Sequence, residues 1–225
     1  MANGKFHLPT FRLIAIAAVA GMIAGAIGVY VIGSRSGNNE TAIAAAVDPA
    51  AAQLCEAKAE KAKAVGDAAR GEVAGMMAAN PPQSLKDLAF NAPDGKPMTI
   101  ADLSGRTVLV NLWATWCAPC REEMPALDEL QAEMGGDKFE VVAVNVDTGD
   151  DVKPRRFLDE IEVGSLGFYR DNTLGVFNDL KRRGLALGLP VTLLIDGDGC
   201  LLANMNGPAE WASEDAKKLI SAVSQ

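Results

Sequence analysis

The sequence predicts an α/β fold, a three-layer sandwich of helices on a largely buried sheet, preceded by a helical extension and one transmembrane helix. Three observations carry this prediction. A long apolar segment near the N-terminus contains no charged residue. Two apolar segments, 107–113 and 139–146, flank a helical pattern, which describes a βαβ unit with a parallel strand pair. A hairpin pattern over 191–205, followed by a last helical pattern, closes the same sheet.

The apolar segment 13–32 is interpreted as a signal anchor, because about 20 apolar residues cross a bilayer as a helix. A cleaved signal peptide is the alternative, but its apolar region is usually only about 7–15 residues long. Lys5 and Arg12 precede the segment and Arg35 alone follows it closely, which places residues 1–12 in the cytoplasm. We therefore expect a single-pass protein of the inner (cytoplasmic) membrane, with its folded domain in the periplasm.

Charged residues are unevenly distributed. Residues 36–225 hold 18 of the 21 Lys and Arg residues and all 29 Asp and Glu residues. An acidic domain without a basic run is a poor binder of nucleic acid, so no nucleic-acid partner is expected. The only histidine, His7, precedes the span, so the exported part lacks the imidazole of a Cys–His nucleophilic site or of a histidine-containing copper site.

Two segments connect the span to the folded domain. Residues 33–47 are small and polar, which is typical of a flexible linker. Residues 48–79 are predicted to be a helical extension, because Asp48–Pro49 suits an N-cap followed by proline in the first turn. Three glycines between 66 and 75 weaken its later half, so we expect two helical pieces or a frayed end.

Residues 80–225 are expected to form one domain around the sheet. Apolar runs bounded by turn signals mark its strands, and apolar residues at helical spacing mark its helices. In order, the predicted elements are a short edge strand after the turn at 93–97, a buried strand at 107–113, a helix at 117–134, a strand at 139–146, two helices within 152–183 separated by an extended piece at 166–169, a strand at 191–195, its hairpin partner at 200–205 and a helix at 209–223.

Residues 151–171 form a central insertion that lengthens the connection between the strands predicted at 139–146 and 191–195. The insertion either shapes a groove for a partner or is merely structural, and the sequence leaves both readings open. Arg155 and Arg156 within it are interpreted as exposed helix residues, with contact to an acidic partner as the alternative.

Cys117 and Cys120 stand where a predicted buried strand gives way to a helix. The free N–H groups at a helix start stabilise a thiolate, so Cys117 should attack disulfides, and Cys120, one turn further on, should resolve the mixed disulfide. Pro119 stiffens the turn and Ala118 leaves the adjoining surface flat. A structural zinc site is the alternative, but it usually needs four Cys or His ligands, so neither a metal nor another cofactor is expected.

The segment Val110–Pro125 resembles the active-site stretch of the TlpA/ResA/CcmG group of exported reductases. The similarity extends more loosely through 141–146 and 189–197, and covers about residues 80–225. The resemblance implies a thioredoxin-like fold and the activity of a membrane-anchored thiol:disulfide oxidoreductase.

The resemblance also assigns roles around the two cysteines. It implies that Pro190 is a cis-proline facing the dithiol, and that Leu189 offers its backbone to an incoming peptide as an added strand. Trp116, Ala118 and Pro119 would complete the surface that meets the substrate. From the sequence alone, Pro190 is only a proline permitted at a strand start.

Glu123 is predicted to exchange protons with the buried thiol. Where thioredoxin carries a buried acid, this chain has Asn111, which cannot take up a proton at neutral pH. Glu123 matches the acid that ResA-like members place beside their dithiol, and burial there would raise its pKa. The alternative is a solvated residue on the helix face, like the neighbouring Glu122.

Cys55 and Cys200 are predicted to form a structural disulfide. Four cysteines in an oxidising compartment allow three connectivities, and the short spacing selects Cys117–Cys120 as the other pair. Such a bridge would pin the helical extension to the sheet and stabilise the fold by up to about 5 kcal/mol. The alternative is a second redox pair that relays electrons. Within the resembling group, these isolated cysteines point to TlpA.

The resemblance implies a reductant of exported partners, namely a copper chaperone, an oxidase copper-site subunit or an apocytochrome, supplied by a membrane electron carrier. A disulfide-forming oxidase is disfavoured, because Ala118 and Pro119 give the first thiol neither a histidine nor a charge. A copper chaperone is disfavoured because its usual Cys-x-x-x-Cys and His ligands are missing.

Overall fold

The computed structural model of the protein describes residues 48–224. No helix within this range is long and apolar enough to cross a membrane. The predicted anchor at 13–32, the cytoplasmic segment 1–12 and the linker 33–47 lie outside the described residues.

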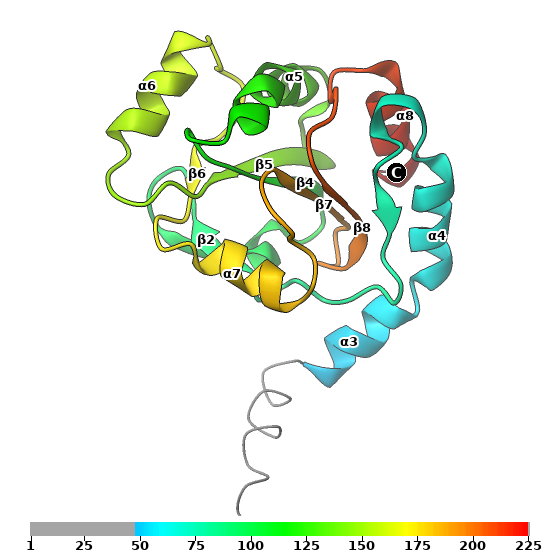
Figure 1. Cartoon of the computed structure of the whole chain (residues 1–225). Coiled ribbons are helices and arrows are strands. Elements are labelled where there is room, and N and C mark those ends of the chain that lie inside the picture. Colours follow the sequence, from blue (N-terminus) through cyan, green and yellow to red (C-terminus); the bar gives the residue numbers. More distant parts are fainter. Residues whose placement is uncertain (1–47, 225) are drawn as a thin grey trace, which may run out of the picture. The chain divides into compact units, whose positions relative to one another are not determined.

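Eight strands form one mixed sheet in the order β1-β8-β7-β4-β5-β6-β2-β3 (Figure 1). In its centre β4 (Thr107–Trp113) is parallel to β5 (Phe139–Asn145), which confirms the predicted parallel pair. On the other side β4 is antiparallel to β7 (Val191–Ile195), and β7 is antiparallel to β8 (Leu201–Asn206). Every residue of β4 and β7 is buried, as their apolar, β-branched sequences predict for strands covered on both faces.

The outer strands are short. On the β5 side, β6 (Tyr169–Arg170) runs parallel to β5, and the hairpin of β2 (Ala89–Asn91) and β3 (Pro97–Thr99) follows. On the β8 side, β1 (Met77–Ala78) is an edge strand that the sequence did not reveal. A strand of two residues carries too little alternation to be recognised from sequence.

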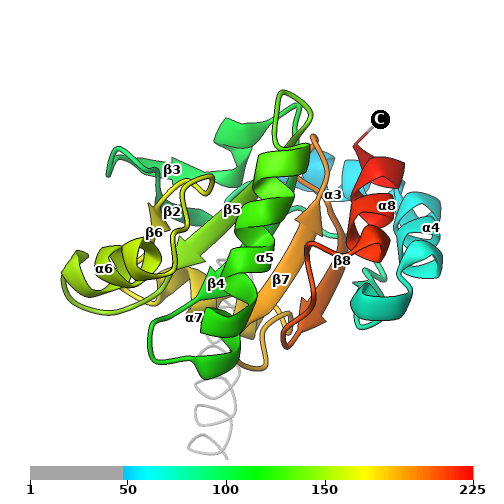
Figure 2. The same ribbon diagram turned by 90° about the horizontal axis from the view of Figure 1, so that it is seen from above.

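Helices cover both faces of the sheet (Figures 1 and 2). Helices α5 (Ala118–Met134) and α8 (Glu214–Val223) lie on one face, and α7 (Gly175–Arg182) lies on the other. This arrangement confirms the thioredoxin-like sandwich. The insertion forms α6 (Val152–Glu160), whose Phe157 ring lies 5.8 Å from that of Trp113, and then continues into β6.

The helical extension packs onto the sheet, where its second helix contacts β1 and β8. It consists of α3 (Pro49–Glu56), α4 (Ala59–Ala68) and the 3₁₀ turn η1 (Gly71–Val73). The helix divides in two, as predicted, but it divides before the glycines. Gly66 lies within α4. A Cβ at this position would lie 2.8 Å from the Cβ of Ala78, so the glycine allows β1 to approach the helix closely.

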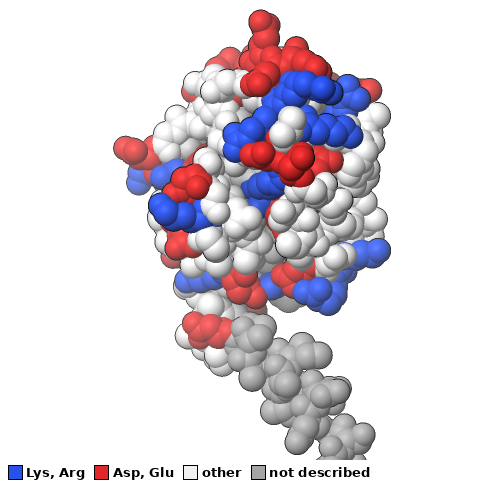
Figure 3. All heavy atoms as spheres, turned by 90° about the vertical axis from the view of Figure 1, so that its left-hand side faces the viewer, with Lys and Arg blue, Asp and Glu red and all other residues white. Residues whose placement is uncertain are grey.

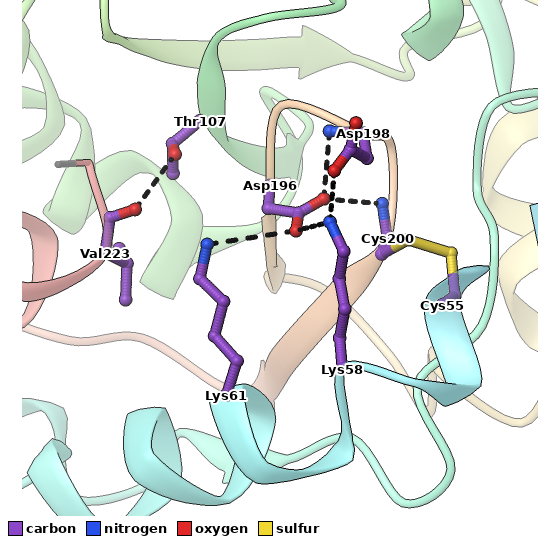
Figure 4. Close-up of polar contacts among 8 residues, drawn as sticks. All are labelled: Cys55, Lys58, Lys61, Thr107, Asp196, Asp198, Cys200 and Val223. Atoms are coloured by element: carbon purple, nitrogen blue, oxygen red, sulfur yellow. Dashed lines mark hydrogen bonds and ion pairs between the residues drawn. A yellow bond between two sulfur atoms is a disulfide. The ribbon is translucent and has the colours of Figure 1, made fainter.

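Tertiary contacts explain where the extension divides (Figure 4). Cys55, in the last turn of α3, is bonded to Cys200 beside β8. Directly after the break, Lys58 forms ion pairs with Asp196 and Asp198 in the β7–β8 turn, and Asp196 also accepts from the backbone N–H of Cys200, 3.1 Å away. These contacts fix the two helices separately on the same end of the sheet.

The last helix begins later than the sequence predicts. The pattern indicated a start near residue 209, whereas α8 starts at Glu214, with Ser213 as an N-cap that accepts from the backbone N–H of Ala216 at 3.2 Å. The preceding residues stay irregular because their donors are used elsewhere, at the candidate active site.

Candidate active site

Cys117 and Cys120 form a disulfide at the start of α5. Cys117 is the N-cap residue, and its sulfur accepts a hydrogen bond from the backbone N–H of Cys120 at 3.3 Å. Cys117 is 7% exposed whereas Cys120 is fully buried. The outer sulfur, which accepts from a backbone N–H at the positive end of the helix, is therefore the one that can meet a substrate as a thiolate.

A buried polar cluster holds the loop before Cys117. The carboxylate of Asp147 accepts from the backbone N–H and the hydroxyl of Thr115, both at 3.0 Å, and from the side-chain amide of Asn145 at 2.8 Å. All three side chains are buried. This anchor leaves the next residue, Trp116, 64% exposed beside the reactive sulfur. Sequence reasoning missed the cluster, because its members come from two different strand ends.

The Leu189–Pro190 peptide bond is cis. Because Val191 is paired with Leu112, Pro190 lies at the carboxyl end of β4, the end from which the chain leads to Cys117. Pro190 accepts from the backbone N–H of Gly207 at 2.9 Å, while the backbone of Leu189 forms no hydrogen bond with the rest of the described chain. Both backbone groups of Leu189 are thus without a partner within residues 48–224, and its role in binding an added strand stays a prediction.

Glu123 is buried, with 3% of its surface exposed, so the solvated alternative is wrong. Its carboxylate accepts from Asn111 Nδ2 at 2.8 Å, from Trp211 Nε1 at 2.9 Å and from the backbone N–H of Ala209 at 3.2 Å. Burial raises the pKa of Glu123 to about 7, and the three hydrogen bonds oppose that rise. A carboxyl with this pKa can both hold and release a proton near neutral pH.

Asn111 connects this carboxyl to the proline strand. Its Nδ2 also donates to the hydroxyl of Thr192 at 3.0 Å, two residues after Pro190. Asn111 Oδ1 is buried and has no partner among the described residues. The contribution of Trp211 and Ala209 was not predicted, because nothing in the sequence shows that the irregular segment before α8 folds back over α5.

Cys55 and Cys200 are both buried, and their disulfide lies at the other end of the sheet. Pro190 precedes the first residue of β7, whereas Cys200 follows the turn after the last one, so the two ends are separated by the length of a five-residue strand, roughly 15 Å. Direct exchange between two disulfides requires contact of their sulfur atoms. The geometry therefore favours a structural bridge over a relay.

Within residues 48–224, no group of three or more His, Cys, Asp or Glu side chains is arranged to hold a metal ion.

A cysteine pair at a helix start, with Cys117 the more accessible and Cys120 fully buried, and a cis-proline loop on a thioredoxin-like sheet define a thiol:disulfide oxidoreductase. Residues 79–220 match the Redoxin family model, and the chain belongs to this family.

Curated relatives agree with this class. The chain is 40% identical over 122 residues to the thioredoxin-like protein YneN of Bacillus subtilis, covering 53% of this chain and 67% of that protein. It is 34% identical over 147 residues to the thiol:disulfide interchange protein DsbE of Pseudomonas fluorescens, covering 61% and 75%. It is 38% identical over 85 residues to the thiol-disulfide oxidoreductase ResA of Oceanobacillus iheyensis, covering 38% and 43%. The resemblance to the TlpA/ResA/CcmG group is thereby confirmed.

A solved structure supports the fold. A DsbF homologue from Corynebacterium diphtheriae superimposes with a TM-score of 0.52 at 22% identity, covering 66% of this chain and 92% of that one.

Proposed function

We propose that the protein is a membrane-anchored periplasmic reductase that transfers electrons from its Cys117–Cys120 dithiol to disulfides of exported proteins. The observation that carries the direction is that Ala118 and Pro119, the two residues between the cysteines, provide neither a histidine nor a charge to stabilise the Cys117 thiolate further. Oxidases of this fold are strong oxidants because their reduced form is stabilised. Without this additional stabilisation of its reduced form, the Cys117–Cys120 dithiol is expected to be a reductant.

The reaction involves two cysteine pairs, Cys117–Cys120 of the protein and the disulfide of the client. The Cys117 thiolate attacks one sulfur of the client disulfide, the client S–S bond breaks, and the first client thiolate leaves. Cys120 then loses its proton and attacks the Cys117 sulfur, which releases the second client thiolate and closes the Cys117–Cys120 bond. The protein loses two electrons and the client gains them. Glu123, one turn after Cys120 and near its pKa at neutral pH, is proposed to take up the Cys120 proton.

The proposed clients are exported proteins of respiratory-chain assembly: a copper chaperone, an oxidase copper-site subunit or an apocytochrome. A membrane electron carrier would return the dithiol to its reduced form. The sequence resemblance and the uncharged segment 13–32 support this proposal. An anchor keeps the reductase next to a carrier and to clients that are themselves in the membrane.

A redox titration tests the direction. The full-length protein is equilibrated with glutathione buffers, and the tryptophan fluorescence is followed, because Trp116 adjoins the dithiol. We expect a potential nearer that of thioredoxin, about −270 mV, than that of the oxidase DsbA, about −120 mV. A potential more oxidising than about −180 mV contradicts the reductase assignment.

Trapping identifies the client. Cys120→Ser should accumulate a mixed disulfide between Cys117 and the client in membranes, because the resolving thiol is gone. The matched control, Cys117→Ser, should trap nothing at this position, since its remaining cysteine is fully buried.

A further inference from the structure

A small hollow opens between α5 and α6, and its lining includes Thr115 and Arg121, which flank the Cys117–Cys120 pair in the sequence. It has a volume of about 170 Å³. This is room for one or two side chains of another molecule. Three of its lining residues are basic and one is acidic; the lining consists of Thr115, Arg121, Lys153, Arg156, Phe157 and Glu160.

Two of the three basic side chains have no acidic partner. The Arg121 guanidinium lies over the Phe157 ring, 5.0 Å from its centroid, and forms no ion pair within the described chain. Lys153 is exposed and likewise forms none with residues 48–224. Arg156, by contrast, forms an ion pair with Glu160, with its Nε 3.3 Å from Glu160 Oε1. The hollow, defined as these six residues, therefore presents two uncompensated positive charges.

This positive charge stands out against an acidic domain. Residues 36–225 carry 18 basic and 29 acidic residues. Figure 3 shows a group of Lys and Arg side chains near the top of one face, at the level where α6 lies in Figure 1, with acidic side chains bordering it. A local positive region on an acidic surface attracts anionic groups to one place and repels them elsewhere.

The hollow and the cis-proline loop lie on opposite sides of Cys117. The sheet order is β7-β4-β5, the proline loop leads into β7, and α6 follows β5. Thr115 precedes Cys117 by two residues, and the backbone N–H of Arg121 donates to the Cys117 carbonyl at 3.1 Å. A client backbone bound at Leu189 and crossing Cys117 would bring its next residues to the hollow.

We propose that this hollow binds an Asp or Glu side chain of the client, close in sequence to the client's reactive cysteine. The inference deepens the proposed function and rests on it. A carboxylate is the anion that an exported protein segment can supply here, and the planar guanidinium of Arg121, which lies over the Phe157 ring, is suited to pair with it. The hollow thus selects among disulfides by the charge beside them.

Three synthetic peptides test the proposal. They share one intramolecular disulfide and differ only in the flanking residues, which are acidic, amide or basic. The reduced full-length protein should give a kcat/KM about three- to tenfold higher for the acidic than for the amide peptide. The kcat/KM for the basic peptide should be lower than that for the amide peptide. The preference should shrink as salt is added, since exposed charges are screened.

Matched variants locate the preference. Arg121→Gln with Lys153→Gln should bring the acidic-to-amide ratio of kcat/KM to about one. The control, Lys138→Gln with Lys218→Gln, removes the same charge from exposed positions away from the hollow and should keep the ratio. Lys153→Glu should give a higher kcat/KM for the basic than for the amide peptide. A poorly folded variant would not show this reversal.

The outcomes are distinguishable. Reduction of all three peptides at equal rates, or a preference that survives Arg121→Gln with Lys153→Gln, overturns the docking proposal and leaves the reductase proposal standing. Failure to reduce any of the peptides contradicts the proposed function itself.

Discussion

At the scale of single residues, the site depends on a carboxyl that no local pattern could fully define. The resemblance suggested Glu123, and its position one turn after Cys120 is visible in the sequence. Its burial is not, because it depends on Trp211 and Ala209, more than 80 residues away. These groups reach Glu123 only because the chain before α8 stays irregular, which helical periodicity cannot reveal.

Burial of this carboxyl should make stability depend on pH. The pKa of Glu123 is about 7 in the folded protein, above its ordinary value of 4.5, so the folded state holds the proton more tightly. Its contribution to stability is therefore full below pH 4.5 and is lost as the pH rises through 7. The difference corresponds to roughly 3 kcal/mol at most. Chemical unfolding of Glu123→Gln should show the variant gaining stability relative to the wild type from pH 5 to pH 8.

The neighbouring Glu122 provides the control, since it is exposed on the same helix. Glu122→Gln should follow the wild type at every pH. Parallel curves for Glu123→Gln and the wild type would show that the carboxyl is not held in its protonated form by burial.

Trp211 should act as a positioning residue for this carboxyl. Its indole N–H, 2.9 Å from Glu123, favours the ionised form, so Trp211→Phe should raise the pKa of Glu123 further. The pH profile of peptide-disulfide reduction should then shift toward alkaline pH. A lower melting temperature with an unmoved profile would assign Trp211 a packing role only.

At the scale of elements, buried strands were the easiest to predict and edge features the hardest. β4 and β7 are mostly apolar and buried throughout, and their bounds match the sequence pattern. β1 has two residues, and the break between α3 and α4 depends on Cys55 and Lys58 contacting a turn about 140 residues later. Local propensity placed that break at the glycines, and tertiary contacts overrode it.

The Cys55–Cys200 bridge should stabilise the fold without taking part in exchange. The double variant Cys55→Ser, Cys200→Ser should unfold at a lower temperature, with a loss of up to about 5 kcal/mol, because a long loop is no longer closed. Its rate of peptide-disulfide reduction should stay within about twofold of the wild type, since the bridge lies a strand length away. Loss of exchange in a variant that remains folded would instead support the electron relay.

At the scale of the whole molecule, the alternation of strands and helices predicted the sandwich. The sheet order then places residues that are distant in the sequence next to one another. The order β7-β4-β5 sets Cys117 between the cis-proline loop and α6. Arg121 and Lys153 are 32 positions apart and meet only through this order. The sequence of the insertion drew attention to Arg155 and Arg156. Arg155 pairs with Asp151, and Arg156 lines the hollow but pairs with Glu160.

The proposed membrane topology predicts that the dithiol is accessible from outside the cytoplasm. After brief reduction of intact spheroplasts, a membrane-impermeant maleimide should label Cys117, the more exposed of the two active-site sulfurs. Cys117→Ser should not be labelled, because Cys120 and the Cys55–Cys200 pair are buried. Labelling of the wild type only after the membrane is permeabilised would contradict the topology.

The Cys55–Cys200 bond also determines how the domain responds to mechanical force. The polypeptide enters the described domain through α3, and this covalent link passes any pull on the preceding chain directly to the start of β8. β8 is paired on both sides, so tension spreads into the interior of the sheet rather than unwinding α4. The load enters at the end of the sheet opposite Pro190. With the proposed membrane anchor, tension on the preceding chain should therefore leave the geometry around the Cys117 sulfur undisturbed.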